Sequence, residues 1–322
     1  MSERDALSSR AIPFMELSDG SAASLTAPPP PLPHYLNAEG RAMARFAVEG
    51  NAVITGGAGT LALAAARALL EHGLANLYLF DLPSTLQSSA QAILSLQTDF
   101  PSSTISTAPV DVTDATLVSS AFSSAAAAMG SLDILLCFAG IVGCIHAIEM
   151  TADQWRKVID INTTGSFLCA QAAAKQMQSQ NTGGTIVFTA SISGRRVNFP
   201  QPQSAYNVSK AAVVAMKDSL AAEWARFGIR VNSISPGRNS VNPLPAVTTE
   251  LQDQISNVFW RIFDTSMHEL ATGTYKIVWA DEEEMEMNAG VPLLERAVAF
   301  GRICEGLWSA IMIVWNSGQN VR

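Results

Sequence analysis

The amino-acid sequence predicts an α/β protein, a doubly wound parallel sheet with helices on both faces. Short apolar runs alternate with longer helical stretches over most of the chain, and the apolar runs lack a polar side. Strands that are apolar on both sides must be covered on both sides, as in parallel sheets flanked by helices. Glycines and polar residues follow the apolar runs, at the strand ends where such sheets bind ligands.

The first 43 residues differ in composition from the rest and predict a disordered arm. They are rich in Ser, Ala and Pro, and Pro28–Pro33 holds five prolines in six positions. A polyproline segment of this kind buries little apolar surface. We therefore expect a single domain over residues 44–322, of which residues 238–322 form a C-terminal segment with weak periodicity.

The alternation begins near Phe46, and each element is read from its local pattern. Buried strands are expected at residues 52–54, 77–80, 106–110, 135–138, 185–189 and 230–234. The first helix is expected in the Ala- and Leu-rich stretch 61–70. A second follows the strand at 77–80 and ends near residue 97, and a third follows the strand at 106–110 and ends near residue 129. Two longer helices are expected at 151–177 and 204–227. Gly73 ends the first of these helices, and Thr151 can cap the helix that begins beside it. Two further helices are expected near residues 249–261 and 292–308.

Composition and charge exclude several classes of protein. The 322 residues carry a net charge of −8, which argues against nucleic acid and anionic lipid as partners. No apolar run reaches the length of a membrane span, and the N-terminus lacks the features of a secretory signal. Four cysteines without metal-site spacing indicate reduced, mostly buried thiols and no metal centre. We therefore expect a cytoplasmic protein.

A Gly-rich turn follows the first strand. Gly56, Gly59 and Ala62 are spaced by three, which suits a tight turn that brings backbone N–H groups to a diphosphate. A plain strand-to-helix turn would read the same way. Asp81, at the end of the next strand, favours the nucleotide interpretation, because its carboxylate can accept from a ribose 2′-hydroxyl and would repel a 2′-phosphate.

A second set of residues lies after the fifth strand. Tyr206 and Lys210 are four residues apart and share one face of a helix. A neighbouring ammonium group lowers the pKa of a phenol, which suits the phenol to acid–base chemistry. The hydroxyl of Ser191, at the end of the preceding strand, could hold a substrate oxygen beside the phenol.

These motifs, in this order and at these strand ends, resemble the short-chain dehydrogenase/reductase family over about residues 44–237, which implies a Rossmann-like sheet. The resemblance implies that Tyr206 is the general acid/base. It implies that Lys210 lowers the phenol pKa and holds the nicotinamide ribose, that Ser191 orients the substrate oxygen, and that Asn162 holds a water in a proton relay. The cofactor residues implied by the motifs are Gly56, Gly59, Leu61, Asp81, Asp111, Val112, Ala139, Gly140, Tyr206, Lys210, Pro236 and Gly237.

The resemblance predicts an oxidoreductase that interconverts a small secondary alcohol and a ketone, with NAD(H) favoured over NADP(H) because of Asp81. The family is usually dimeric or tetrameric, through helices that here begin near Thr151 and Ser204. Cys137-Phe138-Ala139-Gly140 and the stretch at residues 189–194 look like those of fungal polyol dehydrogenases of the mannitol and arabinitol type.

The chain departs from the family pattern at three places. Thr60 and Ala62 replace two glycines of the turn, and a β-branched Thr60 could crowd the cofactor. The spacing to Tyr206 favours Ser193 as the active-site serine, whereas strand alignment and Gly194 favour Ser191. The usual closing motif is missing from residues 238–322. An alternative is therefore a nucleotide-binding regulator or inactive paralogue without turnover, and a third is an interaction protein that uses the Pro-rich arm.

Overall fold

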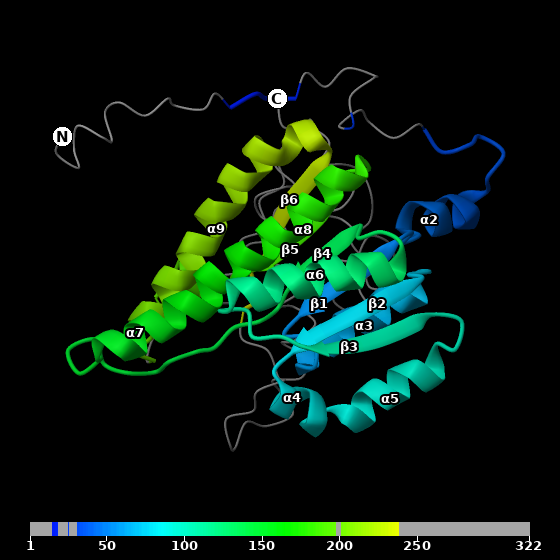
Figure 1. Ribbon diagram of the computed structural model, residues 1–322. Coiled ribbons are helices and arrows are strands. Elements are labelled where there is room, and N and C mark those ends of the chain that lie inside the picture. The colour runs from blue at the N-terminus through cyan, green and yellow to red at the C-terminus, as the bar shows by residue number, and fades with distance from the viewer. Residues whose placement is uncertain (1–14, 19–24, 26–30, 198–200, 238–322) are drawn as a thin grey trace, which may run out of the picture.

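The computed structural model describes residues 15–18, 25, 31–197 and 201–237, which form a parallel six-stranded sheet flanked by helices (Figure 1). The strands are β1 (Asn51–Thr55), β2 (Asn76–Asp81), β3 (Thr104–Pro109), β4 (Ile134–Cys137), β5 (Gly184–Thr189) and β6 (Ile229–Ile234). Their order is β3-β2-β1-β4-β5-β6, so the winding direction reverses between β1 and β4. The predicted fold class is confirmed, and the six predicted strands agree with the structure to within two residues at either end.

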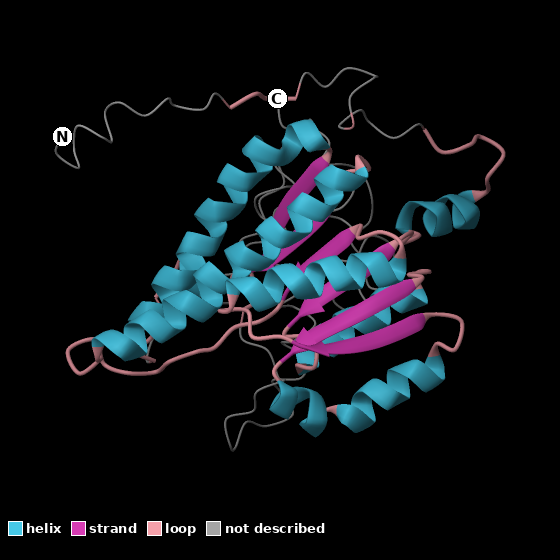
Figure 2. Ribbon diagram, in the orientation of Figure 1, coloured by secondary structure: helices cyan, strands magenta, loops and turns pink. Residues whose placement is uncertain are grey.

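Helices cover both faces of the sheet (Figure 2). On one face lie α3 (Thr60–Glu71), α4 (Pro83–Ser88) and α5 (Ala90–Asp99). On the other lie α6 (Ala115–Met129), α8 (Ser166–Gln180) and α9 (Ser204–Trp224). Two separate hydrophobic clusters fill the two interfaces: Ile54 belongs to the first, with α3 and α5, and Val53 to the second, with α6, α8 and α9. Successive strand residues point to opposite faces, which is why the apolar runs have no polar side.

The helix predicted over residues 151–177 is divided into three parts. Thr151 caps α7 (Ala152–Ile159) in a reciprocal capping box with Gln154, as its position predicts. A π-helical segment, Asp160–Gly165, then leads into α8, which continues to Gln180. Neither the π-helical turn nor the longer C-terminal end was predicted. The helix ends where Asn181 adopts a left-handed conformation with φ of 54°.

The predicted disordered arm is partly wrong, because residues 38–43 belong to helix α2 (Ala38–Phe46). The side chain of Asn37 accepts a hydrogen bond from Gly40 N and caps this helix. None of its residues is buried. Residues 1–14, 19–24 and 26–30 of the predicted arm lie outside the described residues, as do the helices predicted near 249–261 and 292–308.

Deletion of residues 1–36, which retains the Asn37 cap, should leave the thermal unfolding midpoint almost unchanged. The described contacts of this segment include an exposed ion pair of 2.6 Å between Glu16 and Arg226, and exposed pairs contribute about 0–1 kcal/mol. For a domain of this size we expect a shift below about 4 °C, followed by circular dichroism. A larger fall would show that the arm packs on the domain.

Candidate active site

The Gly-rich turn is shaped to approach the end of β4. Gly56 has φ of +64°, and a Cβ atom there would lie 2.6 Å from Ala139 N, so both conformation and space require glycine. Gly59 begins α3 without a side-chain cap, which leaves the N–H groups of its first turn, including that of Leu61, available to an anion. Thr60 is exposed at the first position of the helix. This turn fits the diphosphate of a dinucleotide.

Asp81 lies against this turn. Its Oδ2 accepts a hydrogen bond of 3.0 Å from Ala58 N, and its Oδ1 accepts one of 2.8 Å from Leu82 N. A carboxylate has about four acceptor positions, so capacity remains for ligand hydroxyls. The structure therefore brings the predicted ribose-binding carboxylate to the predicted phosphate-binding turn.

The remaining predicted cofactor residues lie at the same edge of the sheet but differ in environment. Asp111 is exposed and accepts hydrogen bonds from the backbone N and Oγ1 of Thr113. Val112 is buried, and its side chain leaves no room for a Cβ at Gly165. Pro236 O accepts from Ile192 N at 3.3 Å, which joins the end of β6 to the segment after β5. Gly237 is the last residue described before the C-terminal segment.

Asn162, on the π-helical turn, is fully buried beneath the loop after β4. Its Oδ1 accepts from Ile141 N at 2.8 Å, and its Nδ2 donates to Ile141 O at 2.9 Å and to Ser209 Oγ at 3.0 Å. Both amide protons are therefore used within the protein. A Cβ at Gly140 would lie 3.2 Å from Asn162 Oδ1 and 3.6 Å from Lys210 Nζ, so this glycine allows the loop, Asn162 and Lys210 to lie close together.

The hydroxyl of Ser191 lies near the phenol of Tyr206 and lowers the pKa of that phenol, although Ser191 follows β5 and Tyr206 lies in the first turn of α9. Ser193 lies behind Ser191: its backbone N donates to Ser191 Oγ at 3.1 Å, and the two Oγ atoms are 2.9 Å apart. Of the two candidate serines, Ser191 is thus the one whose hydroxyl acts on the Tyr206 phenol.

Lys210 is buried beside Tyr206. Its Nζ donates to Thr189 O at 2.6 Å and lies 5.7 Å from the centre of the Tyr206 ring. Burial lowers the pKa of Lys210 to about 8, partly opposed by the nearby Cys137. Burial also raises the pKa of Tyr206, against the hydrogen bond from Ser191. The predicted lowering of the phenol pKa is therefore not found in this structure, because desolvation outweighs the favourable contacts.

Alanine at Ser191 should reduce turnover more than alanine at Ser193. If Tyr206 exchanges the proton, as the sequence predicts, the loss of Ser191 removes a hydroxyl near the group that would carry charge. We expect kcat/KM to fall about 10- to 100-fold for Ser191→Ala and by less than about tenfold for Ser193→Ala. Steady-state kinetics on one alcohol substrate measures both. The opposite ranking would transfer the role to Ser193.

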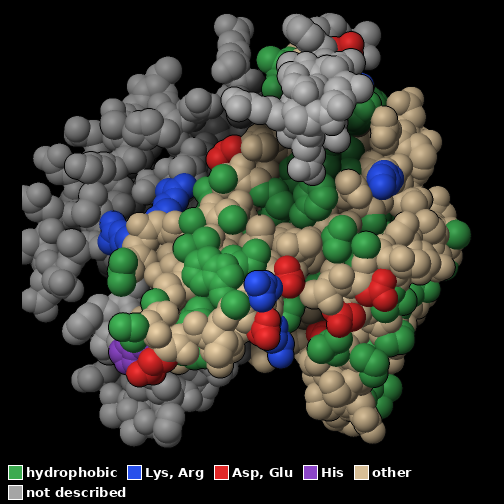
Figure 3. All heavy atoms as spheres, turned by 60° about the vertical axis from the view of Figure 1, so that its left-hand side comes forward, with side chains coloured by type: hydrophobic (Ala, Val, Ile, Leu, Met, Phe, Trp, Pro, Cys, Tyr) green, Lys and Arg blue, Asp and Glu red, His purple; other side chains and the backbone are tan. Residues whose placement is uncertain are grey.

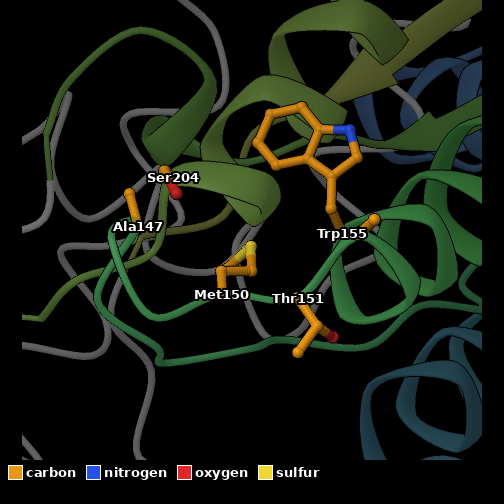
Figure 4. A pocket seen from close by; sticks show the side chains of 6 residues that line it. Ala147, Met150, Thr151, Trp155 and Ser204 are labelled. Carbon is orange, nitrogen blue, oxygen red and sulfur yellow. The ribbon is translucent and has the colours of Figure 1, made fainter.

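A hollow of about 330 Å³ lies at the start of α9, the helix that carries Tyr206, and was not predicted (Figure 4). It is lined by Ala147, Met150, Thr151, Ala152, Trp155 and Ser204. Ser204 is two residues before Tyr206, and the other residues come from the loop after β4 and the start of α7. Nothing in the sequence pattern singles out this loop, because its lining residues are ordinary apolar and hydroxyl side chains.

The surface near this hollow carries exposed hydrophobic side chains. Three of them are Ile148 in the loop before α7, Trp155 in α7 and Val208 in α9. Figure 3 brings the α7 and α9 side of the molecule forward and shows hydrophobic side chains lying among charged ones. Over the described ranges, no three metal-ligating side chains cluster, and no helix is long and apolar enough to cross a bilayer.

The sequence model of the short chain dehydrogenase family matches residues 50–251. The chain belongs to the short-chain dehydrogenase/reductase family. It is therefore an oxidoreductase of a family that uses NAD(P), and its fungal polyol-type motifs agree with its relatives. One is D-arabinitol 2-dehydrogenase of Scheffersomyces stipitis, 37% identical over 202 residues, or 60% of this chain and 72% of that enzyme.

Further relatives include both cofactor types. NADP-dependent mannitol dehydrogenase of Alternaria alternata is 43% identical over 108 residues, covering 34% of this chain and 42% of that enzyme. Among solved structures, a short-chain dehydrogenase/reductase from Mycobacterium marinum is 35% identical, with a TM-score of 0.58 over 62% of this chain and 79% of that one. NAD+-bound xylitol dehydrogenase is 31% identical, with a TM-score of 0.54 over 65% and 76%.

Proposed function

We propose that this short-chain dehydrogenase/reductase interconverts a secondary alcohol of the polyol class and the corresponding ketone, using NAD(H) in preference to NADP(H). The observation that carries the proposal is the buried ammonium group of Lys210, 5.7 Å from the centre of the Tyr206 ring, with the hydroxyl of Ser191 near the phenol. A phenol, a hydroxyl and a cation at one point suit proton transfer at a substrate oxygen.

In this proposal, Tyr206 moves the proton and Ser191 positions the oxygen that gains or loses it. The Ser191 hydroxyl donates to the substrate oxygen, which places that oxygen beside Tyr206 Oη. During oxidation, the phenolate takes the proton of the alcohol; during reduction, the phenol returns it. When bound, a nicotinamide cofactor would accept the hydride of the reacting carbon during oxidation and would donate a hydride to it during reduction.

Lys210 acts on the phenol from a fixed position. Its hydrogen bond to Thr189 O holds the ammonium group at the end of β5, on the side of α9 that carries Tyr206. With a pKa of about 8, the group is still mostly charged at pH 7. A charged group near the ring stabilises the phenolate during proton transfer, even though burial alone disfavours that phenolate. Asn162 contributes by holding the loop at Ile141 next to Lys210.

The polyol assignment rests on the similarity to D-arabinitol and mannitol dehydrogenases and to xylitol dehydrogenase. The preference for NAD(H) rests on the carboxylate of Asp81 beside the phosphate-binding turn. The exposed hydrophobic residues Ile148, Trp155 and Val208 support a homodimer or homotetramer formed through α7 and α9.

The purified chain should reduce NAD+ in the presence of one or more five- or six-carbon polyols, measured by absorbance of the reduced cofactor. A panel of alditols with NAD+ and NADP+ tests substrate class and cofactor together. A nucleotide-binding regulator without turnover is the second candidate, favoured by the replacement of turn glycines by Thr60 and Ala62. Tight NADH binding without oxidation of any alditol, and without reduction of any ketose, would favour that candidate.

A further inference from the structure

The peptide groups around Ala58, at the centre of the Gly-rich turn, are held on two sides. Ala58 N donates to Asp81 Oδ2 at 3.0 Å, and Ala58 O accepts from Ser89 Oγ at 2.9 Å. Ala58 itself is 3% exposed. A buried carbonyl that loses its donor bears the cost of desolvation, so the turn depends on both partners to keep its shape.

The two partners come from different elements of the same strand–helix unit. Asp81 is the last residue of β2, whereas Ser89 lies where α4 ends and α5 begins. A serine at the start of a helix ordinarily caps that helix, yet Ser89 makes no side-chain cap to α5. Its hydroxyl is directed instead to a residue 31 positions earlier in the chain.

We propose that Ser89 is a positioning residue for cofactor binding: together with Asp81 it clamps Ala58 and holds the turn in the shape that receives the cofactor diphosphate. The inference rests on the proposed function, because it assumes that the diphosphate lies at the turn. Ser89 does not touch the cofactor. It acts through Ala58, on a part of the site that NADH and NADPH share.

The clamp predicts a different signature for Ser89 than for Asp81. The diphosphate is common to both cofactors, so loosening the turn should weaken the binding of NADH and of NADPH by the same factor. Asp81 also faces the region where the two cofactors differ, so a substitution there should alter the ratio of the two dissociation constants. Equal loss of both affinities with an unchanged ratio therefore marks the role of Ser89.

The test is a calorimetric titration of the full chain with NADH and with NADPH. Ser89→Ala should raise both dissociation constants about 3- to 10-fold, the effect of one lost hydrogen bond, and leave their ratio unchanged. Ser89→Thr retains the hydroxyl and should restore most of the affinity. The matched control is Ser88→Ala, because the adjacent hydroxyl donates to Thr85 O within α4 and should not affect either constant.

The kcat of Ser89→Ala at saturating cofactor should stay close to that of the native chain, which excludes a general loss of folded protein. Native affinity in Ser89→Ala, loss of one cofactor only, or equal losses in Ser88→Ala and Ser89→Ala would each overturn the clamp. Failure of the native chain to bind either cofactor would instead overturn the proposed function, and the inference with it.

Discussion

Replacing Tyr206 with phenylalanine should lower kcat by at least about 10²-fold, the lower range for lost acid–base catalysis. The substitution keeps the ring that packs beside Lys210 and removes only the hydroxyl that lies near Ser191. The dissociation constant for NADH should change far less than kcat, because Tyr206 is only one of the twelve predicted cofactor residues. Stopped-flow or steady-state measurement on the alditol identified for the native enzyme gives the rate, and titration gives the cofactor affinity.

The pH dependence provides a second readout of the same residue. Alcohol oxidation needs the deprotonated phenol, and burial raises the pKa of Tyr206, so the native oxidation rate should rise with pH across the neutral range. This rise should be absent from Tyr206→Phe. Tyr35→Phe is the matched control, because Tyr35 is 86% exposed and distant in sequence from the site. A Tyr206→Phe enzyme with near-native turnover would refute the assignment.

The native chain should bind NADH about tenfold to several hundredfold more tightly than NADPH. The carboxylate of Asp81 would lie a few ångströms from a 2′-phosphate, and two like charges at that separation cost about 1–4 kcal/mol, depending on the dielectric. No Arg or Lys in residues 82–89 offsets this charge. Paired titrations with the two reduced cofactors measure the ratio.

Two substitutions of Asp81 separate its charge from its contacts with the turn. Asp81→Asn removes the charge and retains one carbonyl acceptor for Ala58 N or Leu82 N, so it should narrow the preference with a small loss of NADH affinity. Asp81→Ser should also narrow or reverse the preference, but its side chain is too short to reach both N–H groups, so both affinities should fall. Asp153→Asn, at an exposed site on α7, is the control. If the native chain binds NADPH more tightly than NADH, the role that we assign to Asp81 is wrong.

Local pattern was sufficient for the strands and for most of the candidate site. The apolar run around Val53 and Ile54 predicts a strand that is buried on both sides. In the structure, the two side chains belong to different hydrophobic clusters, because neighbouring residues of a strand point to opposite faces. Because parallel strands end at the same edge, the sequence also placed Asp81, Ser191 and Pro236 in one region. The helical spacing of Tyr206 and Lys210 placed them on one face in the same way.

The choice between Ser191 and Ser193 depended on tertiary structure. Both lie just after β5, and the sequence favours each by a different argument. The packing of α9 against that segment brings Tyr206 near Ser191, which supports Ser191 and leaves the choice to the two alanine substitutions. The direction of the Tyr206 pKa likewise depends on burial by distant elements, which the Tyr-x-x-x-Lys spacing does not contain.

The sequence by itself determined the fold class, the strand positions and the family, and it supplied the residues that we propose for the site. These follow from periodicity and from motifs whose members are close in the chain. The helical start at Ala38 was missed although it depends on a local cap by Asn37 and none of the residues of the helix is buried. Tertiary structure alone decided the π-helical turn at Asn162 and the clamp from Ser89 to Ala58. The bonds of Asn162 and Ser89 join residues more than 20 positions apart, so their geometry arises only when the helices pack on the sheet.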